Sequence, residues 1–255
     1  MIRFELKRML TSKMLLLGAF ILCLSLLSYV WRDILYSETE DLLCMYELGW
    51  ALSAALLIVP VVSLISYGVS HFNDESTGYS SLMITRSGLQ NYITIKFIVA
   101  FLSGFIMIVL TAILFSAIVA IIRPEALHIT ETSAIYGDFW NAMIEKGGGW
   151  LFFLIKIFMM GCLAGLCSAM GMALSPYLKN KYIVFAAPFF VCELLSTAAE
   201  YLGLYLLKPY NIPLRNSIGR LAFGGLPYAL CYVGMLLLGF YLLFDHGIRR
   251  KLLHG

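Results

Sequence analysis

The chain has 255 residues, of which 61% are hydrophobic and only 13% carry a charged side chain, and its formal net charge is +3. Soluble domains carry about a quarter charged residues, so a chain with a mean hydropathy of +0.87 has too little polar surface to fold in water. The composition excludes a soluble domain and predicts an all-α integral membrane protein, because a helix satisfies its own backbone groups within lipid.

The segment before the first apolar block is basic and has helical spacing. Its apolar residues recur every three or four positions: Ile2, Leu6, Met9 and Leu10. Its cations Arg3, Lys7 and Arg8 lie off this stripe. We predict a short amphipathic helix over residues 2–13 that lies in the inner membrane interface. The alternative is a basic flank that only sets the topology of the first span.

About six long apolar blocks follow, each bounded by charges, Gly or Pro. At about 1.5 Å per residue, the roughly 18 residues of the first block cross about 27 Å of hydrocarbon, close to the thickness of a bilayer core. We predict one transmembrane domain over residues 1–255 with spans at 14–31, 48–69, 93–122, 150–175, 182–206 and 227–244. The fifth block contains Pro188, Glu193 and Glu200, which favour a break before its end. A re-entrant hairpin is then predicted from Tyr210 to Pro227.

The distribution of Lys and Arg between the short loops predicts the orientation of the spans. With the N-terminus inside, the inner flanks hold most of the cations: Arg3, Lys7, Arg8, Lys13, Arg86, Lys96, Lys179, Lys181, Arg249, Arg250 and Lys251. The outer flanks hold most of the acids. We therefore predict a multi-pass protein of the cell membrane with both termini in the cytoplasm.

Motifs for catalysis are missing from the sequence. No histidine falls in an apolar block, and H-E-x-x-H and G-x-S-x-G are absent, so a zinc or serine protease is not expected. The chain has no Gly-Lys dipeptide and hence no G-x-x-x-x-G-K-[ST] phosphate loop. Its six cysteines include no C-x-x-C pair and predict no disulfide framework. We expect no catalytic residue, no metal site and no cofactor in this chain, and no nucleic-acid partner.

The inner loop after the second span, from His71 to Gly88, has the signals of a short cytoplasmic helix. Asn73 or Asp74 can cap it, and Glu75 lies in its first turn. Leu82 and Met83 give it an apolar patch, and the pair Ser87-Gly88 ends it. Lys96 then leads into the third span, where its ammonium group can snorkel to the interface.

This loop resembles the corresponding loop in the permease subunits of type-2 ABC exporters. The resemblance is carried by Glu75, Gly78, Leu82, Arg86 and Lys96. It implies an N-terminal interfacial helix, about six spans, a coupling helix at this loop, and a re-entrant hairpin before the last span. It also implies two separate ATPase subunits that bind ATP and Mg²⁺, and a second permease, identical or homologous. The residues expected to couple to the ATPase are Asp74, Glu75, Gly78, Leu82, Met83 and Arg86. The alternative is an ordinary inner loop.

Small residues follow one another four positions apart in the fourth span: Gly161, Gly165, Ala169 and Ala173. Such a face lets another helix backbone approach closely. The neighbouring helix is either in the same chain or in a partner.

Three ionisable residues lie within or near the apolar blocks, namely Lys156, Glu193 and Glu200. An isolated charge in the membrane is costly, so each is a candidate for a substrate path or for a structural ion pair. We expect Lys156 either to pair with Glu193 or Glu200 or to snorkel to the outer interface.

The expected function is that of the membrane-spanning subunit of an ATP-driven exporter, which moves an amphipathic or lipid-like substrate such as an antimicrobial peptide or drug. A secondary carrier or channel that uses Lys156 and the two glutamates without an ATPase is the first alternative. A membrane-embedded enzyme or assembly factor is the second.

Overall fold

The structure is a computed structural model that describes residues 1–36, 41–129, 138–178, 180–204, 208–214 and 226–254. These residues form helices and their connections, without a β-strand. In chain order the helices are α1 (Ile2–Leu10), α2 (Lys13–Tyr36), α3 (Leu42–Leu52), α4 (Ala55–Val62), α5 (Ser70–Ser76), α6 (Tyr79–Ser87), α7 (Leu89–Ile122), the 3-10 helix η1 (Pro124–Leu127), α8 (Asp138–Met143), the π-helix η2 (Ile144–Gly148), α9 (Gly149–Leu174), α10 (Lys181–Tyr201), α11 (Asn211–Leu214) and α12 (Leu226–His254).

Five of these helices are long and apolar enough to cross a membrane: α2, α7, α9 with the short helices before it, α10 and α12. They coincide with the first, third, fourth, fifth and sixth predicted spans, so the expected all-helical fold of a multi-pass membrane protein is confirmed at this level. The predicted re-entrant hairpin, 210–227, falls largely on residues 215–225, which lie outside the described residues. α10 ends at Tyr201, earlier than the predicted span, and Gly203 follows it in a left-handed conformation (φ 68°).

The second predicted span, 48–69, is not one continuous helix. In its place α3 and α4 meet at a bend of 75°. α3 begins at Leu42, six residues before the predicted start of the span at Leu48. Asp41 caps it, because its carboxylate accepts a hydrogen bond from the backbone N–H of Cys44 at 2.9 Å. Ser53 adopts an extended backbone, and its hydroxyl accepts a hydrogen bond from the N–H of Ala55 at 3.0 Å. The serine thus ends one helix and begins the next.

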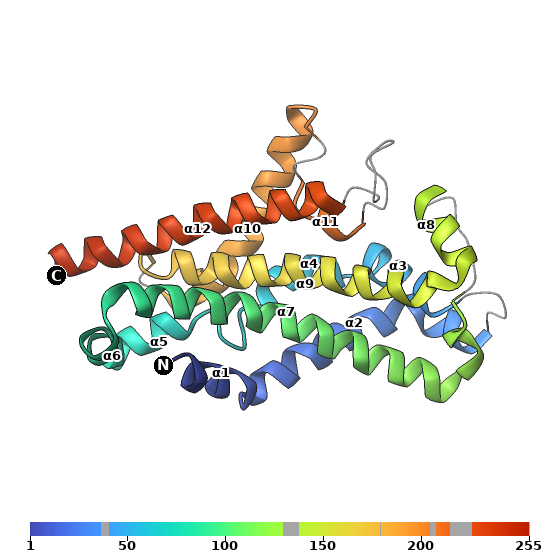
Figure 1. Ribbon diagram of the computed structural model, residues 1–255, viewed down its shortest axis with the longest axis horizontal. Helices are drawn as coiled ribbons and strands as arrows, with labels where there is room; N and C mark the ends of the chain where they lie inside the picture. The colour runs from blue at the N-terminus through green and yellow to red at the C-terminus, as the bar shows by residue number, and fades with distance from the viewer. Residues whose placement is uncertain (37–40, 130–137, 179, 205–207, 215–225, 255) are drawn as a thin grey trace.

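The long helices run side by side along the longest axis of the molecule, and both chain termini lie at the same end (Figure 1). We call this the terminal end, and the opposite end, where α2 finishes and α9 begins, the distal end. α7 and α9 form the central pair, α2 packs against α7, and α12 packs mainly against α9. α10 contacts α4 and α9 and projects away from the other long helices (Figure 1).

The face of small residues on α9 is a close helix contact, and its neighbour is α7 of the same chain. A Cβ atom added to Gly161 would lie 2.7 Å from the ring of Phe105, and one added to Gly165 would lie 2.7 Å from the ring of Phe101. The approach is closest at Gly104 of α7, where a Cβ would lie 2.3 Å from the carbonyl oxygen of Ala164. Ala169 and Ala173, which continue the face, are fully buried. The sequence alone did not distinguish this contact from one with a partner chain.

Candidate functional site

The connection between the second and third predicted spans lies at the terminal end and contains two helices, whereas the sequence predicted one. Asn73 and Asp74, the predicted caps, lie inside α5. Gly78 separates α5 from α6 because it takes a left-handed conformation (φ 70°), which glycine adopts without strain. The predicted end of the helix at Ser87-Gly88 is confirmed, and Gly88 also has a positive φ of 80°.

α6 is the most open helix of this region. None of its residues is buried, and the side chain of Leu82 is 59% exposed. Arg86 is also exposed, whereas Met83 is half-buried against the apolar cluster that includes Met9 and Tyr92. α6 therefore presents an apolar and a basic side chain outward, while its other side packs against α5 and α7.

Beneath this surface lies a set of four charges, the charge cluster, formed by the buried Glu5, Asp74 and Lys96 and by Arg8, whose side chain is 38% exposed. The Nζ of Lys96 lies 3.1 Å from Oε1 of Glu5 and 2.5 Å from Oδ2 of Asp74. Arg8 donates a hydrogen bond to Oδ1 of Asp74 at 2.9 Å. The side chains of Glu5 and Lys96 are both 0% exposed. The cluster thus joins α1, α5 and α7, through buried ion pairs at Lys96 and a partly exposed one at Arg8.

Tyr67 completes the hydrogen bonding of this cluster. Its hydroxyl donates to Oε2 of Glu5 at 2.6 Å and accepts from Nζ of Lys96 at 3.0 Å. Two carboxylates face two cations, so the cluster is formally neutral. Pairing of opposite charges is what makes buried charges tolerable.

The prediction that Lys96 snorkels to the interface is wrong, and Glu5 was missed altogether. Lys96 is held inside because two carboxylates from distant parts of the chain converge on its ammonium group. A signal for Glu5 was present in the sequence. Glu5 lies three residues after Ile2 and four before Met9, and so falls within the apolar stripe of α1. An acid on an apolar face indicates a buried cationic partner, although it does not say which one.

A second set of contacts ties α5 to α7 and α12. Nδ1 of the buried His71 lies 2.9 Å from the hydroxyl of Tyr92, and Lys251 donates a hydrogen bond to Glu75 at 2.5 Å. Burial lowers the pKa of His71 to about 4, so its imidazole is neutral at neutral pH. Asp74 and Glu75, both predicted to face an ATPase, are thus engaged within the chain.

The three intramembrane ionisable residues are not brought together. Lys156, only 6% exposed, pairs with Glu47 of α3 at 2.5 Å. Glu193 accepts a hydrogen bond from the hydroxyl of Tyr210 at 3.0 Å, and Glu200 pairs with Lys208 at 2.9 Å. The predicted pairing of Lys156 with Glu193 or Glu200 is therefore wrong, as is its snorkelling. α3 begins early enough to place Glu47 within reach of α9, whereas α10, which carries both predicted glutamates, diverges from the bundle (Figure 1).

This pairing predicts a double-mutant cycle. Lys156→Met should destabilise the protein by about 3 kcal/mol or more, because it leaves the Glu47 carboxylate in an apolar setting without its cation. Adding Glu47→Gln should recover much of the loss, whereas adding Glu193→Gln, the matched control, should not. Unfolding of the purified protein, followed by heating in detergent, measures the three variants. Equal recovery with either glutamine would contradict the assignment.

Among the described residues, no group of three or more His, Cys, Asp and Glu side chains is arranged to hold a metal ion. The arrangement at the terminal end is instead suited to transmitting a displacement from the surface to a membrane-spanning helix. It combines an exposed helix, α6, with a charge cluster that fixes the neighbouring α5 to a membrane-spanning helix. Comparison of the chain with protein-family models, with curated proteins and with solved structures gives no match.

Proposed function

We propose that this chain is the membrane-spanning subunit of an ATP-driven ABC exporter in the cell membrane, with both termini in the cytoplasm. The observation that carries the proposal is the combination of an open α6, with Leu82 59% exposed, and a charge cluster that ties α5 to α7. A surface that transmits a displacement from another protein needs both an exposed helix and a rigid connection to the membrane-spanning helices. Without that connection the exposed helix would move alone.

In this proposal, α6 docks on an ATPase subunit. When the ATPase pair closes on ATP, the displacement of α5 and α6 passes through Asp74 to Lys96 of α7 and to Arg8 of α1. Ion pairs with short, charge-assisted hydrogen bonds transmit such a displacement well because they resist stretching. The path between two permeases, identical or homologous, then alternates between inward and outward access as nucleotide binds and leaves.

The substrate we favour is amphipathic or lipid-like, such as an antimicrobial peptide or drug. Support comes from the neutralisation of the intramembrane charges within the chain. Lys156, Glu193 and Glu200 each have a partner side chain in the same chain, so they offer little to a small ion or sugar. This also weakens the alternative of a carrier that moves ions along these three residues. ATP and Mg²⁺ belong to the ATPase subunits in this proposal, of which we expect two.

The docking proposal is tested by Leu82→Asp. A carboxylate in the centre of an apolar contact should reduce retention of the ATPase subunits during purification by about tenfold, since burying an unpaired charge costs well over 1.4 kcal/mol. Leu252→Asp on α12 is the matched control, because Leu252 is 55% exposed and lies at the same terminal end. It should leave retention unchanged. Co-purification from cells that contain the natural ATPase partner measures both variants.

Leu82 is a better target than Glu75, because Glu75 already pairs with Lys251 and its replacement would disturb the chain itself. Folding of Leu82→Asp is verified by an unchanged melting temperature. Full retention of the ATPase in that variant would refute docking at α6. A wild-type protein that transports substrate without any co-purifying ATPase would favour the carrier.

A further inference from the structure

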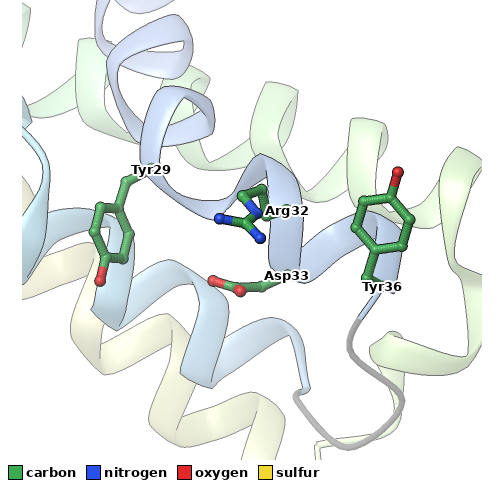
Figure 2. Close-up of a pocket in the computed structure, with 4 residues that line it drawn as sticks. All are labelled: Tyr29, Arg32, Asp33 and Tyr36. Atoms are coloured by element: carbon green, nitrogen blue, oxygen red, sulfur yellow. The ribbon is translucent and has the colours of Figure 1, made fainter.

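A pocket of about 500 Å³ opens beside the last two turns of α2, at the distal end and far from the charge cluster. It is lined by Tyr29, Arg32, Asp33 and Tyr36. The spacing of three, one and three residues places all four on one side of the helix. Figure 2 shows Arg32 and Asp33 between the two tyrosine rings.

Arg32 and Asp33 are charged groups of opposite sign that do not satisfy each other. Within the part of the chain that the structure describes, neither side chain takes part in an ion pair or a hydrogen bond. Both side chains line the same pocket. The pocket therefore offers a cationic and an anionic group to one ligand. A ligand that matches both carries an anion and a cation a few atoms apart.

The place of the pocket on α2 indicates where such a ligand comes from. α2 is long and apolar enough to span a membrane, and the pocket lies at its end. Trp31 beside it is 46% exposed, and aromatic side chains at the end of a span mark the level of the lipid headgroups. Further along α2 the exposed side chains are apolar: Leu17, Phe20 and Leu24. Helical spacing places these side chains on another side of α2 than the four pocket residues, so they mark the depth of the hydrocarbon, and the pocket lies beyond it at the level of the headgroups.

We propose that this pocket binds the headgroup of a zwitterionic phospholipid with a primary amine, of the phosphatidylethanolamine class. Arg32 binds the phosphate, for which the planar guanidinium offers two parallel hydrogen bonds. Asp33 accepts hydrogen bonds from the ammonium group, and the rings of Tyr29 and Tyr36 line the pocket on either side. A choline headgroup has no N–H to donate and should bind less well. The inference does not depend on the exporter assignment, because it concerns binding and not transport.

The test is native mass spectrometry of the purified full-length protein, released from detergent after incubation with phosphatidylethanolamine, phosphatidylglycerol and phosphatidylcholine of identical acyl chains. We expect the wild type to retain phosphatidylethanolamine about tenfold more than the other two lipids. One additional charge-assisted hydrogen bond contributes enough binding free energy for a tenfold difference in affinity. Arg32→Gln should reduce the retention of all three lipids. Asp33→Asn should abolish only the preference, leaving phosphatidylglycerol bound as well as or better than before.

Glu125→Gln is the matched control, because Glu125 is an exposed carboxylate of η1 that does not line the pocket. It should leave the preference unchanged. Equal retention of the three lipids by the wild type would overturn the proposal. So would an Asp33→Asn variant that keeps the preference. Water-soluble glycerophosphoethanolamine separates the two sources of this headgroup: displacement of the lipid at matching concentration would assign the pocket to a free solute and overturn the lipid assignment.

Discussion

Lys96→Met should lower the free energy of unfolding by about 3 to 5 kcal/mol, the typical cost of breaking a buried ion pair by removing one partner. Lys96 is 0% exposed and neutralises both Glu5 and Asp74, so its loss leaves two buried carboxylates with Arg8 as their remaining cation. Methionine fills a similar volume, which makes the lost charge the dominant effect. Thermal or chemical unfolding of the purified protein in detergent measures it.

The matched rescue is Lys96→Met combined with Glu5→Gln, which restores neutrality and leaves the Arg8–Asp74 pair in place. We expect this double variant to recover at least half of the lost stability. Arg249→Met, which breaks an exposed pair with Asp245 one helical turn away, should change stability little. If the single Lys96 variant behaved like the Arg249 control, the charge cluster would not be the connection between α5 and α7.

Gly104→Ala should destabilise the protein by about 1 to 3 kcal/mol, the typical cost of overpacking. The new Cβ atom would lie 2.3 Å from the carbonyl oxygen of Ala164, so the α9 backbone itself would have to move away from α7. Gly161→Ala should cost less, because its obstacle is the ring of Phe105, at 2.7 Å, and a side chain moves more easily than a helix. The melting temperature of each variant in detergent gives the order.

The matched control for this series is Gly234→Ala on α12, where nothing lies within 4 Å of the new Cβ atom. Alanine favours a helix over glycine by about 1 kcal/mol, so this variant should melt at the same temperature as the wild type or slightly higher. The series thus compares one methyl group at three sites that differ only in their surroundings. A Gly104→Ala protein that melts like the Gly234→Ala protein would mean that α7 and α9 do not touch at this level.

The two sets of variants probe different parts of the proposed mechanism. The charge cluster connects the exposed α5–α6 region to α7, and the glycine contact connects α7 to α9 at the centre of the bundle. In the proposed mechanism, a displacement at α6 passes through the charge cluster to α7 and through the glycine contact to α9. Variants of the cluster that still fold should therefore uncouple ATP hydrolysis from transport in the proposed exporter.

The sequence by itself determined the parts of this protein that depend on local properties. The long helices α2, α7, α9, α10 and α12 were predicted because length and hydropathy are set by consecutive residues. The helix at the N-terminus and the end of α6 at Gly88 followed equally from spacing and from the conformational freedom of glycine. The face of small residues on α9 was recognised for the same reason.

Only the tertiary structure decided which charges meet. Lys96 and Asp74 are 22 residues apart, Tyr67 and Glu5 are 62 apart, and Arg8 and Asp74 are 66 apart. Lys156 pairs with Glu47 and not with the glutamates of α10. Glu47 lies on α3, which begins earlier than the hydropathy indicated. Hydropathy measures the cost of placing a charge in the membrane but does not say toward which neighbouring helix the charged side chain points. The partner of each charge is decided by helix packing, of α1, α5 and α7 at one site and of α3 on α9 at the other. Each buried ammonium group is stable only where the fold brings a carboxylate to it.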